Sequence, residues 1–128
     1  RLDFYMEKKD EKYLMEVKGC TLEIDGIGYF PDAPSERAVR HLHELMHAVK
    51  QGYHCILAFV IAMPGVTVVR PNMTTHPAFG QALSEAMAAG VEVWYLPCEI
   101  TADSIQIKGR KRKYYSVQDR LYPHVVIQ

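Results

Sequence analysis

A short and almost wholly apolar run, Tyr53–Ala62, constrains the fold of this chain more than any other stretch. The run is too short to span a membrane and is rich in residues that favour strands, so it predicts a β-strand. Because apolar and polar residues do not alternate along it, both faces of that strand must be covered. The sequence therefore predicts a central sheet strand with a packing layer on each side.

Two amphipathic helices are predicted, one before and one after this strand. Glu36–Lys50 follows a good N-cap, Ser35, and ends before Gly52, while Pro77–Ala89 ends at Gly90. The two helix-to-strand passages through these glycines indicate α/β units with right-handed crossovers and parallel strand pairing. The first helix has one apolar face, formed by Ala38, Leu42, Leu45, Met46 and Val49.

The beginning of the chain predicts antiparallel strands instead. Asp25-Gly26 suits a two-residue type I′ turn between strands at Thr21–Ile24 and Ile27–Phe30. Glu7–Lys12 is predicted to be a charged turn. The other predicted strands are Arg1–Met6, Tyr13–Lys18, Val66–Val69, Val91–Leu96 and Ser104–Lys108, with a further candidate at Arg120–Gln128.

Composition limits the function classes. The chain has 128 residues, which predicts one domain, and its 15 basic and 15 acidic residues give no global attraction to nucleic acid or membrane. Its 3 scattered cysteines fit a reducing cytoplasm without a disulfide framework. No signal peptide or transmembrane-length apolar run is present. The first residue, Arg1, already lies inside a predicted strand, so we expect a fragment of a longer cytoplasmic protein.

The strand Tyr13–Lys18 carries the candidate chemistry. Side chains on a strand repeat every second residue, so Glu16 and Lys18 point to the same face. Such a pair has two interpretations, a surface ion pair or half of a metal-dependent phosphodiester site. The second needs another acid, for which Asp3 is the candidate. From these residues alone the surface pair is the more common situation.

Several motifs along the chain favour the second interpretation. They are Arg1-x-Asp3-Phe4, Met15-Glu16-Val17-Lys18, Tyr29-Phe30-Pro31-Asp32-Ala33-Pro34-Ser35-x-Arg37, His41-Leu42-x-Glu44-Leu45, Arg70-Pro71-Asn72, His76-Pro77-x-Phe79 and Ala89-Gly90-Val91. Taken together, these motifs resemble the sugar fermentation stimulation protein family from Arg1 to about Lys108. The resemblance implies an OB-like nucleic-acid-binding domain followed by a PD-(D/E)xK nuclease-like domain, of which this chain is similar to the second.

The resemblance implies a restriction-endonuclease-like α/β fold, a mixed central sheet with antiparallel N-terminal strands and flanking helices. It also implies site residues. Asp3, Glu16 and the backbone carbonyl of Val17 would bind Mg²⁺ or Mn²⁺, and Lys18 would orient or help deprotonate water and stabilise the phosphate. The catalytic set is therefore Asp3, Glu16 and Lys18. One departure is Ala62, which stands where the family usually has Gln.

Basic residues are candidate nucleic-acid contacts, with DNA favoured over RNA. Arg37 and Arg40 lie in and beside the first turn of a helix, whose N-terminus attracts phosphate, and Lys50 and Arg70 complete the set. The alternative for the arginines is ordinary solvated side chains. The basic run Gly109–Lys113 either touches a nucleic-acid backbone or belongs to a flexible tail.

Three further features have structural alternatives. Asp32 either caps the helix that follows it or lies near the metal. His43 and His47 have a spacing that can bind Zn²⁺, but an exposed basic helix face explains them better because no further ligand is evident. Cys20, close to Lys18, is predicted to be a small packed residue and not a nucleophile.

The resemblance thus implies that residues 1–108 form the nuclease-like domain, and residues 109–128 are predicted to be a basic extension. The predicted function is a nucleic-acid-binding domain with a divalent-metal site, either a nuclease or a DNA-binding regulator of sugar metabolism. The alternatives are an inactive DNA-binding module and a structural domain that supports the missing OB-like half. Oligomer formation is left open, and no membrane partner is expected.

Overall fold

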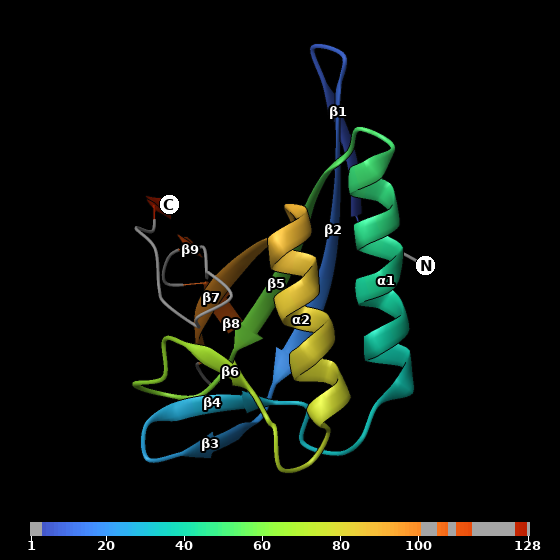
Figure 1. Cartoon of the computed structure of the whole chain (residues 1–128). Coiled ribbons are helices and arrows are strands. Elements are labelled where there is room, and N and C mark those ends of the chain that lie inside the picture. Colours follow the sequence, from blue (N-terminus) through green and yellow to red (C-terminus); the bar gives the residue numbers. More distant parts are fainter. Residues whose placement is uncertain (1–3, 101–104, 108–109, 114–124, 128) are drawn as a thin grey trace.

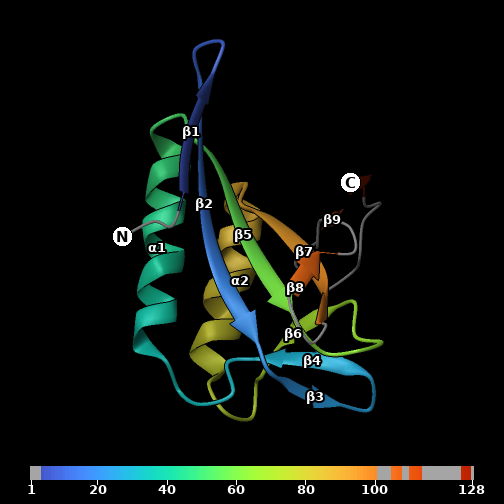
Figure 2. The same ribbon diagram turned by 180° about the vertical axis from the view of Figure 1, so that it is seen from behind.

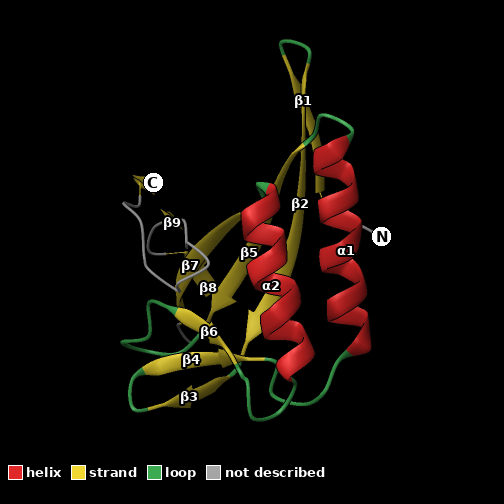
Figure 3. Cartoon of the chain, viewed as in Figure 1, coloured by secondary structure: helices red, strands yellow, loops and turns green. Residues whose placement is uncertain are grey.

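The computed structural model describes residues 4–100, 105–107, 110–113 and 125–127. In this part of the chain, two helices pack side by side on one face of a sheet (Figure 1, Figure 3). The helices are α1 (Glu36–Lys50) and α2 (Pro77–Ala89). The strands are β1 (Phe4–Lys8), β2 (Glu11–Cys20), β3 (Leu22–Ile24), β4 (Ile27–Phe30), β5 (His54–Ile61), β6 (Val69–Pro71), β7 (Glu92–Ile100), β8 (Ile105–Ile107), β9 (Arg110–Lys113) and β10 (Val125–Ile127).

The main sheet is mixed, as predicted. Its described strands follow the order β1-β2-β5-β7-β9-β10, with β8 also paired to β7. β1 and β2 form an antiparallel hairpin, whereas β2, β5 and β7 run parallel to one another. Parallel neighbours need long crossover connections, and here these contain α1 and α2. The predicted combination of antiparallel strands at the start with later α/β units is confirmed.

The central strand β5 is covered on both faces, which confirms the prediction made from its continuous apolar run. One face points to the helices through Leu57 and Phe59 and belongs to the larger apolar core. The other face is the one turned away from the helices, and Figure 2 views the sheet from that side. On this face Ile56 and Ala58 pack with Trp94 in a second cluster. The larger core therefore lies between the sheet and the two helices.

A small second sheet closes one end of the domain. β3 and β4 form the predicted hairpin, in which Asp25 and Gly26 both have positive φ, 53° and 85°. β6 then pairs with β4 in parallel. The hairpin packs closely against β2, because a Cβ added at Gly28 would lie 3.0 Å from Cys20 Sγ. The N-terminal strands are therefore divided between two sheets.

Some predicted boundaries were wrong. Most of the charged turn Glu7–Lys12 is strand, and the turn is reduced to Lys9 and Asp10, which both have positive φ. The strand predicted at Val66–Val69 is shifted to β6, because its partner β4 lies beside Val69–Pro71. These errors share one cause, since strand pairing with a distant segment sets the boundaries and local composition does not.

The helix termini follow the sequence signals. Ser35 caps α1, and its Oγ accepts a hydrogen bond from the backbone N–H of Ala38 at 3.1 Å. Gly90 ends α2 in the left-handed conformation with φ 114°. In the described part of the chain, neither helix is long and apolar enough to cross a membrane.

The basic run after residue 108 contains β9, which pairs with β7 in the main sheet. β9 also pairs with β10, near the end of the chain. The division of the chain at residue 108 stays a prediction.

Candidate metal centre

Strand β2 delivers Glu16 and Lys18 to the same side of the sheet, as the strand period predicts. Leu14 and Cys20 point to this side too and are buried in the larger core. Met15 and Val17 point to the opposite side and pack against the second cluster. Glu16 and Lys18 therefore lie among the β2 side chains that face the helices.

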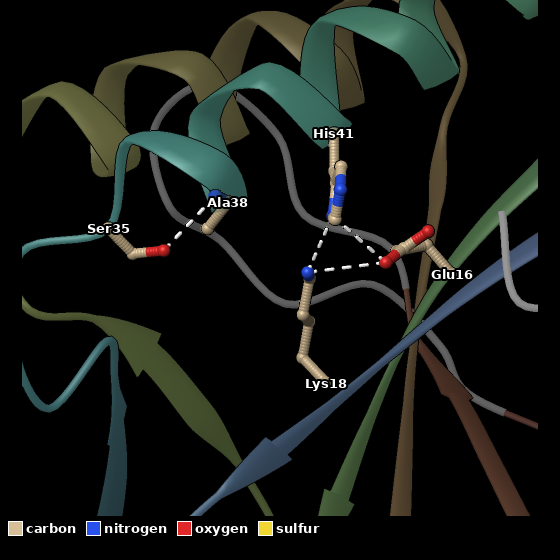
Figure 4. A network of polar contacts seen from close by, with 5 residues as sticks. All are labelled: Glu16, Lys18, Ser35, Ala38 and His41. Atoms are coloured by element: carbon tan, nitrogen blue, oxygen red, sulfur yellow. Dashed lines mark hydrogen bonds and ion pairs between the residues drawn. The ribbon is translucent and has the colours of Figure 1, made fainter. Parts of the chain in front are cut away.

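A third side chain reaches this pair from helix α1. Figure 4 shows His41 pointing from the helix toward both Glu16 and Lys18. Lys18 Nζ lies 2.7 Å from His41 Nδ1 and 3.2 Å from Glu16 Oε2, and His41 Nδ1 lies 3.0 Å from the same carboxylate oxygen. The three polar atoms thus form a small triangle between strand and helix.

The Glu16 carboxylate is almost completely buried, with 1% of its side chain exposed. One of its oxygens, Oε2, contacts Lys18 and His41, but the other, Oε1, has no hydrogen-bond partner among the described residues. Removing a carboxylate from water costs several kcal/mol, and each buried oxygen without a partner adds to that cost. A buried acceptor oxygen of this kind fits Mg²⁺, Mn²⁺ or Ca²⁺, which prefer oxygen ligands.

The surroundings of His41 favour its neutral form. Burial lowers the pKa of His41 from the ordinary 6.5, and the positive charge of Lys18 lowers it further, while the negative charge of Glu16 acts in the opposite direction. A neutral imidazole with its proton on Nε2 can accept at Nδ1. The Lys18 ammonium therefore donates to both Glu16 Oε2 and His41 Nδ1, and it bridges two acceptors that would otherwise repel each other.

The other two predicted metal ligands are Asp3 and the backbone carbonyl of Val17. Asp3 lies outside the described residues, so its pairing with Glu16 stays a prediction. Val17 lies on β2 between the two charged residues, and the role of its carbonyl is likewise still a prediction. The described residues alone contain no group of three or more His, Cys, Asp or Glu side chains arranged to hold a metal ion.

The predicted nucleic-acid contacts are exposed but are not all near the triangle. Arg37 lies one helical turn before His41 and contributes to the lowering of the His41 pKa, so it is close to the site. Arg40 is exposed on the same helix, and Arg70 is exposed on β6. Lys50 ends α1, about two and a half turns beyond His41. Of these four basic residues, Arg37 is the one whose charge acts on His41.

The remaining candidates from the sequence are Asp32, the histidines His43 and His47, and Cys20. Ser35, and not Asp32, provides the side chain that caps α1. His43 and His47 are exposed, and no metal-binding group includes them in the part of the chain that the structure describes. Cys20 is buried with its thiol directed at the carbonyl of Tyr29, and burial raises the pKa of this thiol. A raised pKa disfavours the nucleophilic thiolate, which agrees with a packing role.

The sequence prediction missed His41 as a site residue. A signal was present, because His41 occupies a position between Ala38 and Leu45 that belongs to the buried stripe of the predicted helix. A polar residue at such a position needs a partner across the interface. The partner could not be identified, because the pairing of α1 with β2 depends on the tertiary fold.

Other motif residues build the scaffold around the centre. Asn72 follows β6, and its side chain donates to the carbonyl of Pro31 at 3.0 Å, which joins the ends of β6 and β4. His76 Nδ1 accepts from the backbone N–H of Ser35 at 3.2 Å, which ties the beginning of α2 to the beginning of α1. These contacts fix the helix that carries His41 relative to the sheet.

Comparisons with known proteins agree with this architecture. The model of the Sugar fermentation stimulation protein RE domain matches residues 1–104. A Sugar fermentation stimulation protein homolog of Desulfitobacterium hafniense (strain Y51) is 49% identical over 83% of this chain and 46% of its own length. The homolog of Clostridium beijerinckii is 47% identical over 84% of this chain and 48% of its own length. The chain therefore spans about half the length of the curated relatives it matches.

A solved structure is similar as well. The structure of Pyrococcus furiosus SfsA in complex with Ca²⁺ superposes with a TM-score of 0.80 and 30% identity, and covers 86% of this chain and 48% of that chain. The mixed α/β architecture is thus shared with that protein. By its sequence and its fold, this chain belongs to the sugar fermentation stimulation protein family.

Proposed function

We propose that this chain is a PD-(D/E)xK nuclease-like domain with a restriction-endonuclease-like fold, which uses Mg²⁺ or Mn²⁺ to act on phosphodiester bonds of DNA. The observation that carries the proposal is the buried Glu16 carboxylate, whose Oε1 has no partner among the described residues while Lys18 lies beside Oε2. The Pyrococcus furiosus relative was solved in complex with Ca²⁺, which supports the binding of a divalent cation by this chain.

In this proposal, Asp3, Glu16 and the carbonyl of Val17 supply the oxygen ligands. We place Asp3 opposite Glu16 because Phe4 pairs with Met15 in the β1–β2 hairpin. Asp3 precedes Phe4 in the sequence and Glu16 follows Met15, so an antiparallel register extended by one residue would bring these two acids opposite each other. Two carboxylates on neighbouring strands are a suitable partial ligand set for a small hard cation.

Lys18 is the residue of this chain that supplies a positive charge at the proposed site. A divalent cation, when bound, would neutralise phosphate charge and increase the acidity of water. Lys18 has three N–H donors, of which two are directed at Glu16 and His41. With 14% of its side chain exposed, Lys18 can use the third to orient a water molecule or a phosphate oxygen at the surface.

The exposed basic residues support a second candidate function, DNA binding without turnover. Arg37 and Arg40 lie on the first turns of α1, where the helix N-terminus favours phosphate, and Lys50 and Arg70 are exposed elsewhere. The total charge of the chain is balanced, so any attraction to DNA must come from such local groups. A regulatory role in sugar metabolism would need this activity only.

We also propose that an OB-like domain of the same protein supplies further nucleic-acid contacts in the cytoplasm, since the curated relatives are about twice as long as the matched region. A domain that mainly supports this partner, alone or in an oligomer, is the alternative. DNA cleavage by this chain without the partner would contradict that alternative.

A cleavage assay tests the proposal. Plasmid DNA is incubated with the chain and Mg²⁺ or Mn²⁺, with EDTA as the metal-free control. Glu16→Gln removes the carboxylate charge and Lys18→Met removes the ammonium, so both variants are expected to lose cleavage. Lys8→Met is the matched control, because Lys8 is exposed near the tip of the β1–β2 hairpin.

The outcomes separate the candidates. Metal-dependent cleavage that is retained in Lys8→Met and lost in the two site variants supports the nuclease. If no metal gives cleavage but the chain still retards DNA on a gel in a salt-dependent manner, the second candidate is favoured. Equal cleavage by Glu16→Gln and the unaltered chain would overturn the proposed site.

A further inference from the structure

The Lys18 ammonium has two acceptors among the described residues, and the shorter contact is the one to His41. The distance from Nζ to His41 Nδ1 is 2.7 Å, compared with 3.2 Å to Glu16 Oε2. We propose that His41 is a positioning residue that holds Lys18 in the site while the Glu16 carboxylate binds a cation. This inference rests on the proposed function, because it concerns the same centre.

The rigidity of α1 suits His41 for this role. Only 3% of His41 is exposed, and the neighbouring Leu42 and Leu45 are fully buried in the core. Ser35 caps the helix two turns before, so the ring projects from a well-anchored element toward β2 (Figure 4). His41 therefore offers Lys18 an acceptor at a fixed place, which a water molecule or a mobile side chain would not do.

Charge explains why a second acceptor matters. Lys18 and a divalent cation are both positive and both attracted to the Glu16 carboxylate, so they compete for it and repel each other. His41 attracts the ammonium without adding a negative charge. If His41 lost its acceptor, Glu16 would be the only partner left to Lys18 among the described side chains, and a cation would have to displace the ammonium.

Ca²⁺ titration calorimetry of the full chain tests this role without requiring turnover. His41→Phe keeps a ring of similar size but removes the acceptor, so Ca²⁺ is expected to bind about tenfold more weakly, the effect of one charged hydrogen bond. His41→Asn carries an amide oxygen near the position of Nδ1 and is expected to restore most of the affinity. His47→Phe is the control, because His47 is exposed on the same helix.

The same substitution in the Lys18→Met variant tests whether His41 acts through Lys18. In Lys18→Met there is no ammonium to hold, so adding His41→Phe should leave Ca²⁺ affinity unchanged. The same loss in both backgrounds would show that His41 binds the cation or only supports the fold, and would overturn the inference. No loss in His41→Phe would overturn it as well. If the unaltered chain does not bind Ca²⁺, the proposed site itself fails, and the inference fails with it.

Discussion

Lys18 and His41 lie 23 positions apart in the sequence, on a strand and a helix, yet their side-chain nitrogens are 2.7 Å apart. Glu16 Oε2 lies within 3.2 Å of both nitrogens. Close contact between a lysine and a histidine is favourable only when the imidazole is neutral and accepts, which agrees with the lowered pKa of His41. The cluster is thus arranged around one ammonium with two acceptors.

The first prediction is that this cluster lowers the stability of the fold. Lys18→Met alone should lower the free energy of unfolding by about 2 kcal/mol, because it leaves a buried carboxylate without its counter-charge. The double variant Glu16→Leu/Lys18→Met should instead be at least as stable as the unaltered chain, and by up to about 2 kcal/mol more stable. Urea denaturation measures both. A double variant less stable than the unaltered chain would contradict the prediction and show that the charged pair is stabilising.

The second prediction concerns pH. The pKa of His41 is lowered in the folded chain, so the unfolded chain binds a proton at His41 more readily when the pH falls below 6.5. The contribution of His41 to stability is therefore fully present above pH 6.5 and is lost as the pH falls toward its lower folded-state pKa.

Denaturation midpoints from about pH 8 to about pH 5 test this prediction. His41→Asn should lose less stability on acidification than the unaltered chain, because its side chain does not titrate. Parallel pH profiles for the two proteins would contradict the prediction.

The third prediction concerns the cysteines. Burial raises the pKa of the Cys55 thiol to about 11, and it raises the pKa values of Cys20 and Cys98 as well. Cys20 and Cys55 are buried, whereas Cys98 is partly exposed. Alkylation of the native chain followed by peptide mass spectrometry should therefore find Cys98 modified first. Equally fast modification of Cys55 would show that the core opens readily.

The fourth prediction concerns the end of α2. Gly90 has a φ of 114°, which a residue with a Cβ adopts only with strain, so Gly90→Ala should lower the free energy of unfolding by about 1 kcal/mol or more. Gly19→Ala is the control, because a Cβ there meets nothing within 4 Å and its φ is not positive. Thermal denaturation of both variants is the measurement, and equal melting temperatures would be evidence against the strained cap.

The sequence predicted the local features of the fold and two of the three residues of the described cluster, Glu16 and Lys18. The period of a strand placed Glu16 and Lys18 on one face, and Ser35 and Gly90 marked helix termini, because these signals act within a few residues. The separation of β3, β4 and β6 into a second sheet was not predicted, because it depends on pairing between distant segments. His41 was missed for the same reason, since its partners are on another element.

The central claim is that Glu16 Oε1 binds a divalent cation. The most direct measurement is an anomalous difference map from crystals of the chain soaked in Mn²⁺. We expect a peak at bonding distance from Glu16 Oε1, about 2 Å, with Lys18 still in contact with His41. A well-ordered Glu16 with no peak beside Oε1 at saturating Mn²⁺ would show that this carboxylate does not bind the cation.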